Sequence, residues 1–202
     1  MSDFRLVFVP SSSSGRTIEP ITLGEAKQWL LLEEEETDAD VVIGQLIVTA
    51  RQRYEALTNR QLVKGDYDWF LDDVCHEVLV PPKYPLVSVG SIRAFTDTDA
   101  TDTGGTSMSS SEFYVDTASE PGRIVPVPGY TFPVGTRAAN AYIVRFSCGY
   151  STESTGIPSD AKTTLGKMIA RAWEFRGDQS AAEQEALMDE CVRDEFTVQD
   201  WG

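Results

Sequence analysis

The chain has 202 residues, 41% of them hydrophobic, which is enough for a core in one domain or in two small ones. Its charge is unbalanced, because 32 acidic residues stand against 17 basic ones and give a net charge of −15. Binding to phosphates needs Lys and Arg side chains that displace counterions. The composition therefore argues against a protein that wraps nucleic acid or lies on an anionic membrane.

The cysteines and the N-terminal residues indicate a protein made in the cytoplasm. Cys75, Cys148 and Cys191 are odd in number, lie far apart and form no C-x-x-C spacing, so we expect reduced thiols. No run of 18 apolar residues occurs, and residues 1–5 lack the charge and apolar pattern of a signal peptide. We therefore expect no membrane span and no secretion.

The first 20 residues are expected to form an extended arm ahead of a helix. Residues 6–9 are apolar enough to pair as a strand, and residues 11–15 are a flexible Ser-Gly stretch. Thr22 and Glu25 have the spacing of a capping box, in which each side chain accepts a hydrogen bond from the other residue's backbone. This motif predicts a helix over residues 22–32, which ends where four glutamates meet its negative end.

A second helix is predicted over residues 38–60. Acidic residues in its first turn suit the positive end of a helix. Apolar residues recur there at steps of three and four, which predicts a buried stripe. The stripe consists of Ile43, Leu46, Ile47, Ala50, Tyr54 and Leu57. Val41 and Val48 lie off this stripe, and apolar residues on a second face indicate a second packing partner.

Residues 65–150 change to short β-rich runs that are separated by Pro and Gly. The expected strands cover residues 67–71, 77–80, 87–95, 113–116, 123–127 and 142–148. Residues 96–111 are rich in Thr, Ser, Asp and Gly, which predicts a mobile hairpin loop. The region is interpreted as an antiparallel sheet inserted between helices.

Two further helices are predicted over residues 158–176 and 180–190, followed by an extended tail over residues 191–202. Phe196, Val198 and Trp201 are possible anchors in this tail, and Trp201 is either frayed or anchored in a neighbouring subunit. The fold class is therefore α+β, a small helical bundle with an inserted antiparallel β region. We expect an N-terminal arm over residues 1–20, a single domain over residues 21–190, and the tail.

Acidic side chains gather in two places. Residues 177–202 hold eight acids and one base, and residues 33–40 hold six acids. The second cluster is interpreted either as a solvated turn between helices or as a surface that contacts a partner. Its members are Glu33, Glu34, Glu35, Glu36, Asp38 and Asp40.

The sequence contains no arrangement of residues typical of an enzyme. His76 is the only histidine; a Glu follows it, but the second His of a zinc-protease motif is missing. A Ser-His-Asp triad would need the same His76. Residues 97–102 carry three Asp, but Asp102 and Met108 stand where an EF-hand needs Gly and Glu, so a non-standard cation site and a solvated loop are both open there. We predict no catalytic residue, no cofactor and no metal site.

Three of the tryptophans, Trp29, Trp69 and Trp173, are expected in the core rather than in ligand-binding platforms.

Five segments, in order along the chain, give the sequence a resemblance to a known family. They are Pro20-Ile21-Thr22-Leu23-Gly24-Glu25-Ala26-Lys27, Thr58-Asn59-Arg60, Pro85-Leu86-Val87-Ser88-Val89-Gly90-Ser91-Ile92, Phe113-Tyr114-Val115-Asp116 with Pro121-Gly122-Arg123-Ile124, and Val144-Arg145-Phe146-Ser147-Cys148-Gly149-Tyr150 with Ile157-Pro158. In these segments the chain resembles the head–tail connector (adaptor) family of long-tailed phages and related gene-transfer particles. The resemblance spans residues 20–177 and leaves out the arm and the acidic C-terminal end.

The resemblance implies a structural subunit that forms a ring, usually of 12 copies, below the portal protein at one vertex of the capsid. Such a ring extends the DNA channel, lets genomic DNA pass without specific binding and carries the next neck or tail protein. In a virion assembled in the host cytoplasm, Val41 and Val48 would be candidates for contact between ring subunits. Phe196, Val198 and Trp201 would be candidates for contact with the portal or neck, and the 33–40 cluster for an acidic lumen or partner surface.

Other functions stay open beside this one. The chain would also suit another virion neck component, such as a head-completion or tail-terminator protein. A carbohydrate-active or other enzyme, and a binding module of another kind, are further alternatives. An enzyme would show a pocket with convergent polar groups, whereas a connector would form rings or bind an oligomer of the portal.

Overall fold

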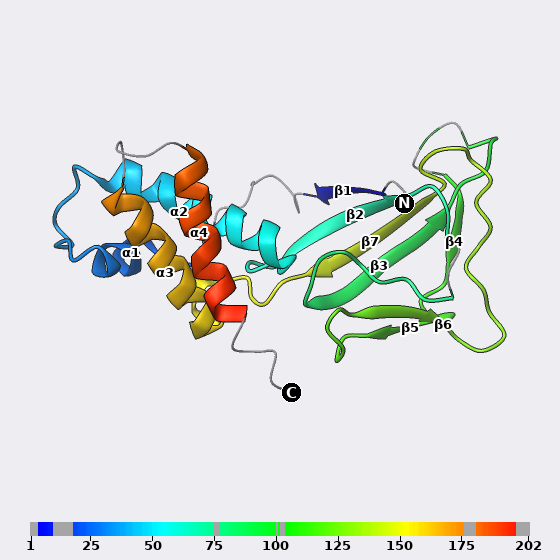
Figure 1. The fold of residues 1–202 in the computed structure, drawn as a ribbon. Helices are drawn as coiled ribbons and strands as arrows, with labels where there is room; N and C mark the ends of the chain where they lie inside the picture. Colours follow the sequence, from blue (N-terminus) through cyan, green and yellow to red (C-terminus); the bar gives the residue numbers. More distant parts are fainter. Residues whose placement is uncertain are drawn as a thin grey trace. The chain divides into compact units, whose positions relative to one another are not determined.

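A computed structural model describes residues 4–9, 18–74, 77–99, 101, 104–175 and 181–196 of the chain. It divides the chain into two compact units (Figure 1). The helical unit comprises Arg16–Val63 and Tyr150–Gly202, and the β unit comprises Met1–Gly15 and Lys64–Gly149. The β unit thus coincides with the predicted β region, together with a strand from the N-terminal arm.

The helical unit is built from four helices and one short 3-10 turn in its described part. These are α1 (Leu23–Trp29), α2 (Asp40–Thr58), η1 (Ser154–Gly156), α3 (Ser159–Glu174) and α4 (Ala181–Phe196). The predicted capping box is present at the start of α1. Thr22 Oγ1 accepts a hydrogen bond from the Glu25 backbone N–H at 3.1 Å, and the Glu25 carboxylate accepts one from the Thr22 N–H at 2.7 Å. Each side chain therefore satisfies a donor that the helix itself leaves unpaired.

The apolar stripes of these helices meet in one core. The side chains with the least exposure there are Ile21, Ala26, Ile43, Ala50, Leu62, Leu165, Met168 and Ile169. Burying an aliphatic side chain of this size contributes roughly 1.5–3 kcal/mol, so the core is the main source of stability of the unit. Ion pairs join the helices around it: Lys162–Glu25 (2.7 Å), Arg53–Asp189 (2.6 Å) and Arg171–Glu190 (2.6 Å).

The β unit contains one five-stranded antiparallel sheet and a separate two-stranded hairpin. The strands are β1 (Phe4–Val9), β2 (Gly65–Leu71), β3 (Leu86–Ala94), β4 (Thr106–Met108), β5 (Phe113–Asp116), β6 (Arg123–Pro126) and β7 (Tyr142–Cys148). The order in the sheet is β1-β2-β7-β3-β4, and β5 pairs with β6. The expected α+β fold class is therefore confirmed.

The two faces of the sheet differ. One face supplies Trp69 from β2 and Val144 from β7 to an apolar cluster that also contains Phe113 from β5 and Ile124 from β6, so the hairpin covers this face. The opposite face is mixed, with a small apolar cluster of Phe70, Phe95 and Ile143 beside charged side chains. Asp68 on β2 and Arg145 on β7 are opposite each other in the register and form an ion pair of 2.6 Å there. The alternation follows from the two-residue period of a strand.

The structure differs from the predicted elements at four places. The expected strand over residues 77–80 is reduced to one bridge, Leu79 to Ile124, because the following Pro81 and Pro82 have no N–H for a ladder. Strand β4 lies inside the expected loop over residues 96–111. Helix α1 ends at Trp29, ahead of Leu31, whose φ of 55° is left-handed and incompatible with a continuing helix.

The fourth difference concerns the C-terminal tail. Helix α4 continues beyond the expected end at residue 190 to Phe196. Met188, Cys191 and Val192 stand at helical spacing and are all buried, so the core draws residues 191 and 192 into the helix. Residues 191–196 are therefore helical rather than extended, and the single domain expected over residues 21–190 stays a prediction. No helix in the described part of the chain has the length and apolar character needed to cross a bilayer.

Candidate interaction surfaces

The acidic turn between α1 and α2, residues 30–39, is fixed by a buried lysine. Lys27 is 3% exposed. Its Nζ donates to the backbone carbonyls of Glu34 at 3.0 Å and Glu36 at 2.7 Å, and it lies 2.7 Å from Asp40 Oδ1. A buried charged group needs polar partners, and this ammonium group finds three of them, two carbonyls and a carboxylate.

This arrangement sorts the predicted acidic cluster into two parts. The side chains of Glu33, Glu34, Glu35, Glu36 and Asp38 are exposed, whereas Asp40 turns toward Lys27 and is half-buried. The turn forms one end of the helical unit, where the chain passes from α1 to α2 (Figure 1). Five carboxylates are therefore presented to solvent on a backbone that Lys27 holds in place.

Exposed apolar side chains accompany the acidic turn. Leu31 is 93% exposed and Val41 is 75% exposed, and Val42 beside it is 43% exposed. Val48, two turns along α2 from Val41, is half-buried. Val41 is therefore largely exposed and Val48 only in part, and contact of either with a second partner stays a prediction.

The far end of α2 is fixed by a buried polar network. Arg51 donates to Glu19 at 2.7 Å and to Glu55 at 3.2 Å. The other oxygen of Glu55 accepts from the Gln61 side chain at 2.8 Å and from the Leu62 N–H at 3.1 Å. Burial alone would lower the pKa of Arg51, but the hydrogen bond to Glu19 and the charge of Glu55 hold that pKa above its ordinary value. The network therefore ties the segments before α1 and after α2 to the helix.

A hollow of about 350 Å³ lies on the helical unit. It is lined by Trp29, Lys167, Ala170, Arg171 and Cys191, and we refer to it as the Trp29 groove. Trp29 is 41% exposed rather than buried as predicted. Its ring packs on Gly166 of α3, where an added Cβ would lie 2.2 Å from the ring, so only glycine leaves room for it.

Most basic side chains in the described part of the helical unit form ion pairs with acidic side chains of the same unit. Lys27, Arg51, Arg53, Lys162 and Arg171 all form ion pairs within the unit. Lys167, in the Trp29 groove, is exposed and forms no ion pair with any residue that the structure describes. The surface of the unit is therefore dominated by carboxylates, and the groove is a place where an unneutralised cation stands beside an exposed aromatic ring.

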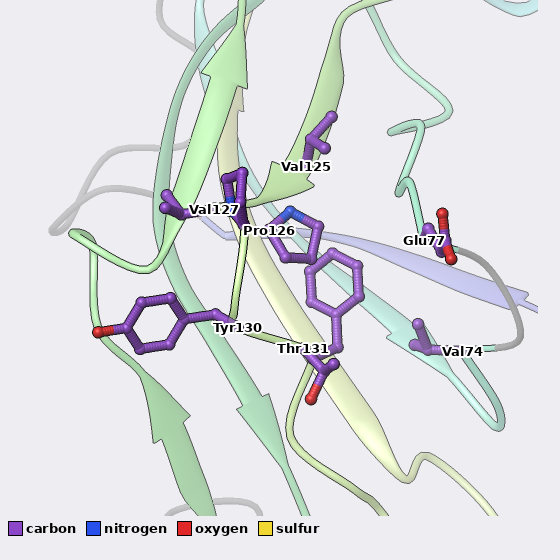
Figure 2. Close-up of a pocket in the computed structure, with 9 residues that line it drawn as sticks. Val74, Glu77, Val125, Pro126, Val127, Tyr130 and Thr131 are labelled. Carbon is purple, nitrogen blue, oxygen red and sulfur yellow. The ribbon is translucent and has the colours of Figure 1, made fainter.

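The β unit has a larger pocket, of about 410 Å³. Its walls are both polar and apolar, and they come from Val74, Glu77, Val125, Pro126, Val127, Pro128, Tyr130, Thr131 and Phe132. Figure 2 shows Glu77 and Tyr130 on opposite sides of the pocket, with the Tyr130 hydroxyl pointing away from the carboxylate. These polar groups do not converge on one point, so they do not form an acid–base pair.

The predicted site residues at the C-terminal end lie mostly outside the described part of the chain. Val198 and Trp201 lie outside the described residues, and Phe196 is described only as the last residue of α4. His76 and Cys75, from the β region, also lie outside the described residues. Cys148 and Cys191 are buried and take part in no disulfide bond.

Asp99, in the loop that follows β3, stabilises the backbone of that loop. Asp99 accepts hydrogen bonds from the Thr96 backbone at 2.7 Å and from the Thr96 hydroxyl at 2.9 Å, and these bonds lower the pKa of Asp99. Among the described residues, no group of three or more His, Cys, Asp or Glu side chains is arranged to hold a metal ion. Asp102, the third acid of the predicted loop, lies outside them.

Comparison with known proteins shows a likeness of fold. No family model matches the chain, and no curated protein matches its sequence. A chain in the neck of an empty gene transfer agent (GTA) particle, computed with C6 symmetry, superposes with a TM-score of 0.68 at 17% identity, over 93% of this chain and 94% of that one. A chain in the neck of the native GTA particle, computed with C12 symmetry, gives 0.67 at 18% identity over 93% and 94%.

A third match is to a chain in the virion of the native GTA particle, with a TM-score of 0.70 at 16% identity, over 92% of this chain and 93% of that one. Over nearly its whole length, the chain therefore has the fold of chains found in GTA particles and their necks.

Proposed function

We propose that the chain is a structural subunit of a virion neck, namely a head–tail connector of a tailed phage or a GTA-like particle. The observation that carries the proposal is the likeness of fold to neck chains over more than nine-tenths of both chains. The five sequence segments that resemble the connector family support it independently, because they occur in the same order. No catalytic step is part of this role.

In this proposal the subunits form a ring, and we expect 12 copies. The C6 and C12 symmetries of the two neck structures support a ring arrangement. A ring needs heterologous contacts, in which one face of a subunit meets a different face of the next. Val41, which is 75% exposed, and Val48 are the candidate contacts, because apolar side chains at a free helix face gain by being covered.

The partners would be the portal protein on one side of the ring and the next neck or tail protein on the other, with the genomic DNA passing through the channel. The charge of the helical unit supports a passage without binding. Its cations are largely paired with its own acids, and Glu33–Glu36 and Asp38 are exposed. Such a surface repels phosphates and offers few sites for DNA to stick. We place these five carboxylates at the channel or at a partner surface.

The C-terminal residues Phe196, Val198 and Trp201 remain candidates for contact with the portal or a neck protein. A truncation of the chain tests this contact, and the structure decides where the truncation should begin. A truncation from residue 191 would remove the buried Cys191 and Val192 and disturb the core. Removal of residues 197–202 alone leaves α4 complete, and it should weaken assembly without unfolding the chain.

The alternatives differ in their expected particles. A head-completion or tail-terminator protein would also be a neck component, but it would stand farther from the portal or on the tail side. An enzyme would need converging polar groups, and Glu77 and Tyr130 in the larger pocket of the β unit face apart.

The proposal is tested by deleting the gene for the chain from the genome that encodes it. We expect capsids and tails that form separately and fail to join, as seen by electron microscopy of lysates. Joined, infectious particles in the deletion strain would contradict the proposal. Free tails with an unfinished end would favour the tail-terminator alternative.

A further inference from the structure

The Trp29 groove combines two properties that attract a particular kind of segment. Trp29 presents a rigid aromatic surface, held flat against Gly166, and large aromatic side chains of this kind dominate the energy of protein interfaces. Lys167 adds a positive charge that no described residue neutralises, whereas Arg171 is already paired with Glu190 at 2.6 Å. The groove therefore fits a segment that carries an aromatic side chain next to an acidic one.

The chain itself contains such a segment. Of the residues outside the described part, only 197–202 join an acid to a large aromatic side chain, in Asp200-Trp201. Trp201 supplies an apolar surface that can stack on Trp29. Asp200 supplies a negative charge that can pair with the ammonium group of Lys167. Aromatic pairs of this kind contribute roughly 0.5–1.5 kcal/mol beyond the area that they bury.

The local sequence favours a second copy as the source of this segment. Cys191 of α4 lines the groove, and α4 ends at Phe196, so the same chain would have to reverse its direction at once to bring Trp201 back. Thr197, Val198 and Gln199 lie between the helix and Asp200. None of them is a Gly, Pro, Asn, Asp or Ser, which dominate turns, and β-branched residues such as Thr197 and Val198 favour extended backbone, so the sequence gives no signal for such a reversal.

We propose that the Trp29 groove of one subunit binds the Asp200-Trp201 segment of a second copy. The inference rests on the proposed function, because a ring of subunits needs a contact between two different surfaces of neighbouring copies. It narrows the partner of Trp201 from a portal or neck protein to a neighbouring subunit. The groove residues and the C-terminal segment then form one interface, with Trp201 against Trp29 and Asp200 beside Lys167.

A natural thiol that lines the groove provides the test. In a Gly202→Cys variant of the full chain, which keeps Asp200 and Trp201 and is incorporated into assembled particles, mild oxidation should join residue 202 of one subunit to Cys191 of another. The result expected is a ladder of covalent oligomers on a non-reducing gel, with the 191–202 linkage identified by mass spectrometry of peptides. A Tyr114→Cys variant is the control, because it places a cysteine at an exposed position of the β unit. Cys191→Ser, and separately Trp201→Ala, in the Gly202→Cys background should abolish the ladder.

Charge reversal tests the polar half of the contact. Lys167→Glu and Asp200→Lys, each combined with Gly202→Cys, should slow cross-linking about threefold, which is the scale of an exposed ion pair, and the two together should restore it. A disulfide within one chain would overturn the assignment to a second copy. Particles that contain the Gly202→Cys chain but yield no 191–202 linkage would overturn the groove and leave the proposed function standing. Absence of the unmodified chain from the particles would overturn both.

Discussion

Lys27 and Asp40 form an ion pair that is closed to solvent on the side of the lysine. The lysine Nζ lies 2.7 Å from Asp40 Oδ1, and the lysine side chain is 4% exposed against 28% for the aspartate. The same ammonium also holds the carbonyls of Glu34 and Glu36. The acidic turn is therefore built around a buried positive charge.

Replacing this lysine should cost stability and loosen the turn. Lys27→Met leaves two carbonyls and a partly buried carboxylate without their partner, and we expect a loss of about 2–3 kcal/mol in the free energy of unfolding. Chemical denaturation measures the loss, and hydrogen exchange should rise in residues 33–38. Lys167→Met, at an exposed position, should change stability by less than about 0.5 kcal/mol. Equal effects of the two variants would contradict the role assigned to Lys27.

The pair Arg53–Asp189 should make the helical unit sensitive to acid. Its two hydrogen bonds, of 2.6 Å and 2.8 Å, lower the pKa of Asp189 in the folded chain. A lowered folded pKa means that the stabilisation is present above the unfolded pKa of about 3.9 and is lost as the pH falls through the folded value.

Asp189→Asn should therefore destabilise the chain by about 1–2 kcal/mol at pH 7, and the difference from the unmodified chain should shrink below about pH 4. Denaturation curves at several pH values measure this. Asp38→Asn, at an exposed position of the acidic turn, is the control and should leave the curves nearly unchanged. A constant difference at all pH values would rule out the ion pair as its cause.

The contact of Trp29 with Gly166 predicts a coupled pair of substitutions. Gly166→Ala puts a methyl group where the indole lies, so we expect a loss of about 1–3 kcal/mol in stability and a change in tryptophan fluorescence. In a Trp29→Ala background the same substitution should cost little, because the space is then empty. Additive effects would show that the two residues do not touch.

The apolar surface at the start of α2 predicts a defect of assembly without a defect of folding. Val41→Lys changes a side chain that is 75% exposed, so the isolated chain should stay folded while its incorporation into particles falls. Val134→Lys is a closely matched control in the β unit, at 76% exposure. Incorporation is measured by gel analysis of purified particles. Equal incorporation of both variants would remove Val41 from the interface between subunits.

Reversing the charge of the acidic turn tests its role at the channel or partner surface. Replacing Glu33–Glu36 with lysine leaves the buried Lys27 and Asp40 in place, and we expect lower infectivity through disturbed assembly or DNA passage. The measurements are particle titre and DNA content. An unchanged titre would favour a merely solvated turn.

The sequence predicts the elements that local signals determine. The capping box at Thr22 and Glu25 and most of the stripe on α2 are local patterns that are found in the structure. Leu57, at the C-terminal end of the predicted stripe, is exposed instead of buried. The prediction of a strand over residues 77–80 is wrong. Its β-rich composition favours a strand, but only Leu79 pairs, with Ile124, before Pro81 and Pro82 stop the ladder. The end of α4 was misplaced because acidic residues hide the buried spacing of Met188 and Val192.

The candidate surfaces depend on contacts between segments that are far apart in the chain, and the residue types alone do not predict these contacts. Nothing next to Lys27 in the sequence marks it as buried, because its partners come from the following turn and from α2. Trp29 was expected in the core, since a tryptophan in an amphipathic helix usually lies there. Its ring packs on Gly166 and is otherwise partly exposed, and that glycine in the middle of a helical stripe is the one available signal for the contact.

Cryo-electron microscopy of assembled particles tests the central proposal most directly. The proposal predicts a ring of 12 copies of this chain in contact with the portal at one vertex of the capsid, around the channel through which DNA passes. Particles whose neck density contains no copy of the chain, or a chain located at the distal end of the tail, would contradict it.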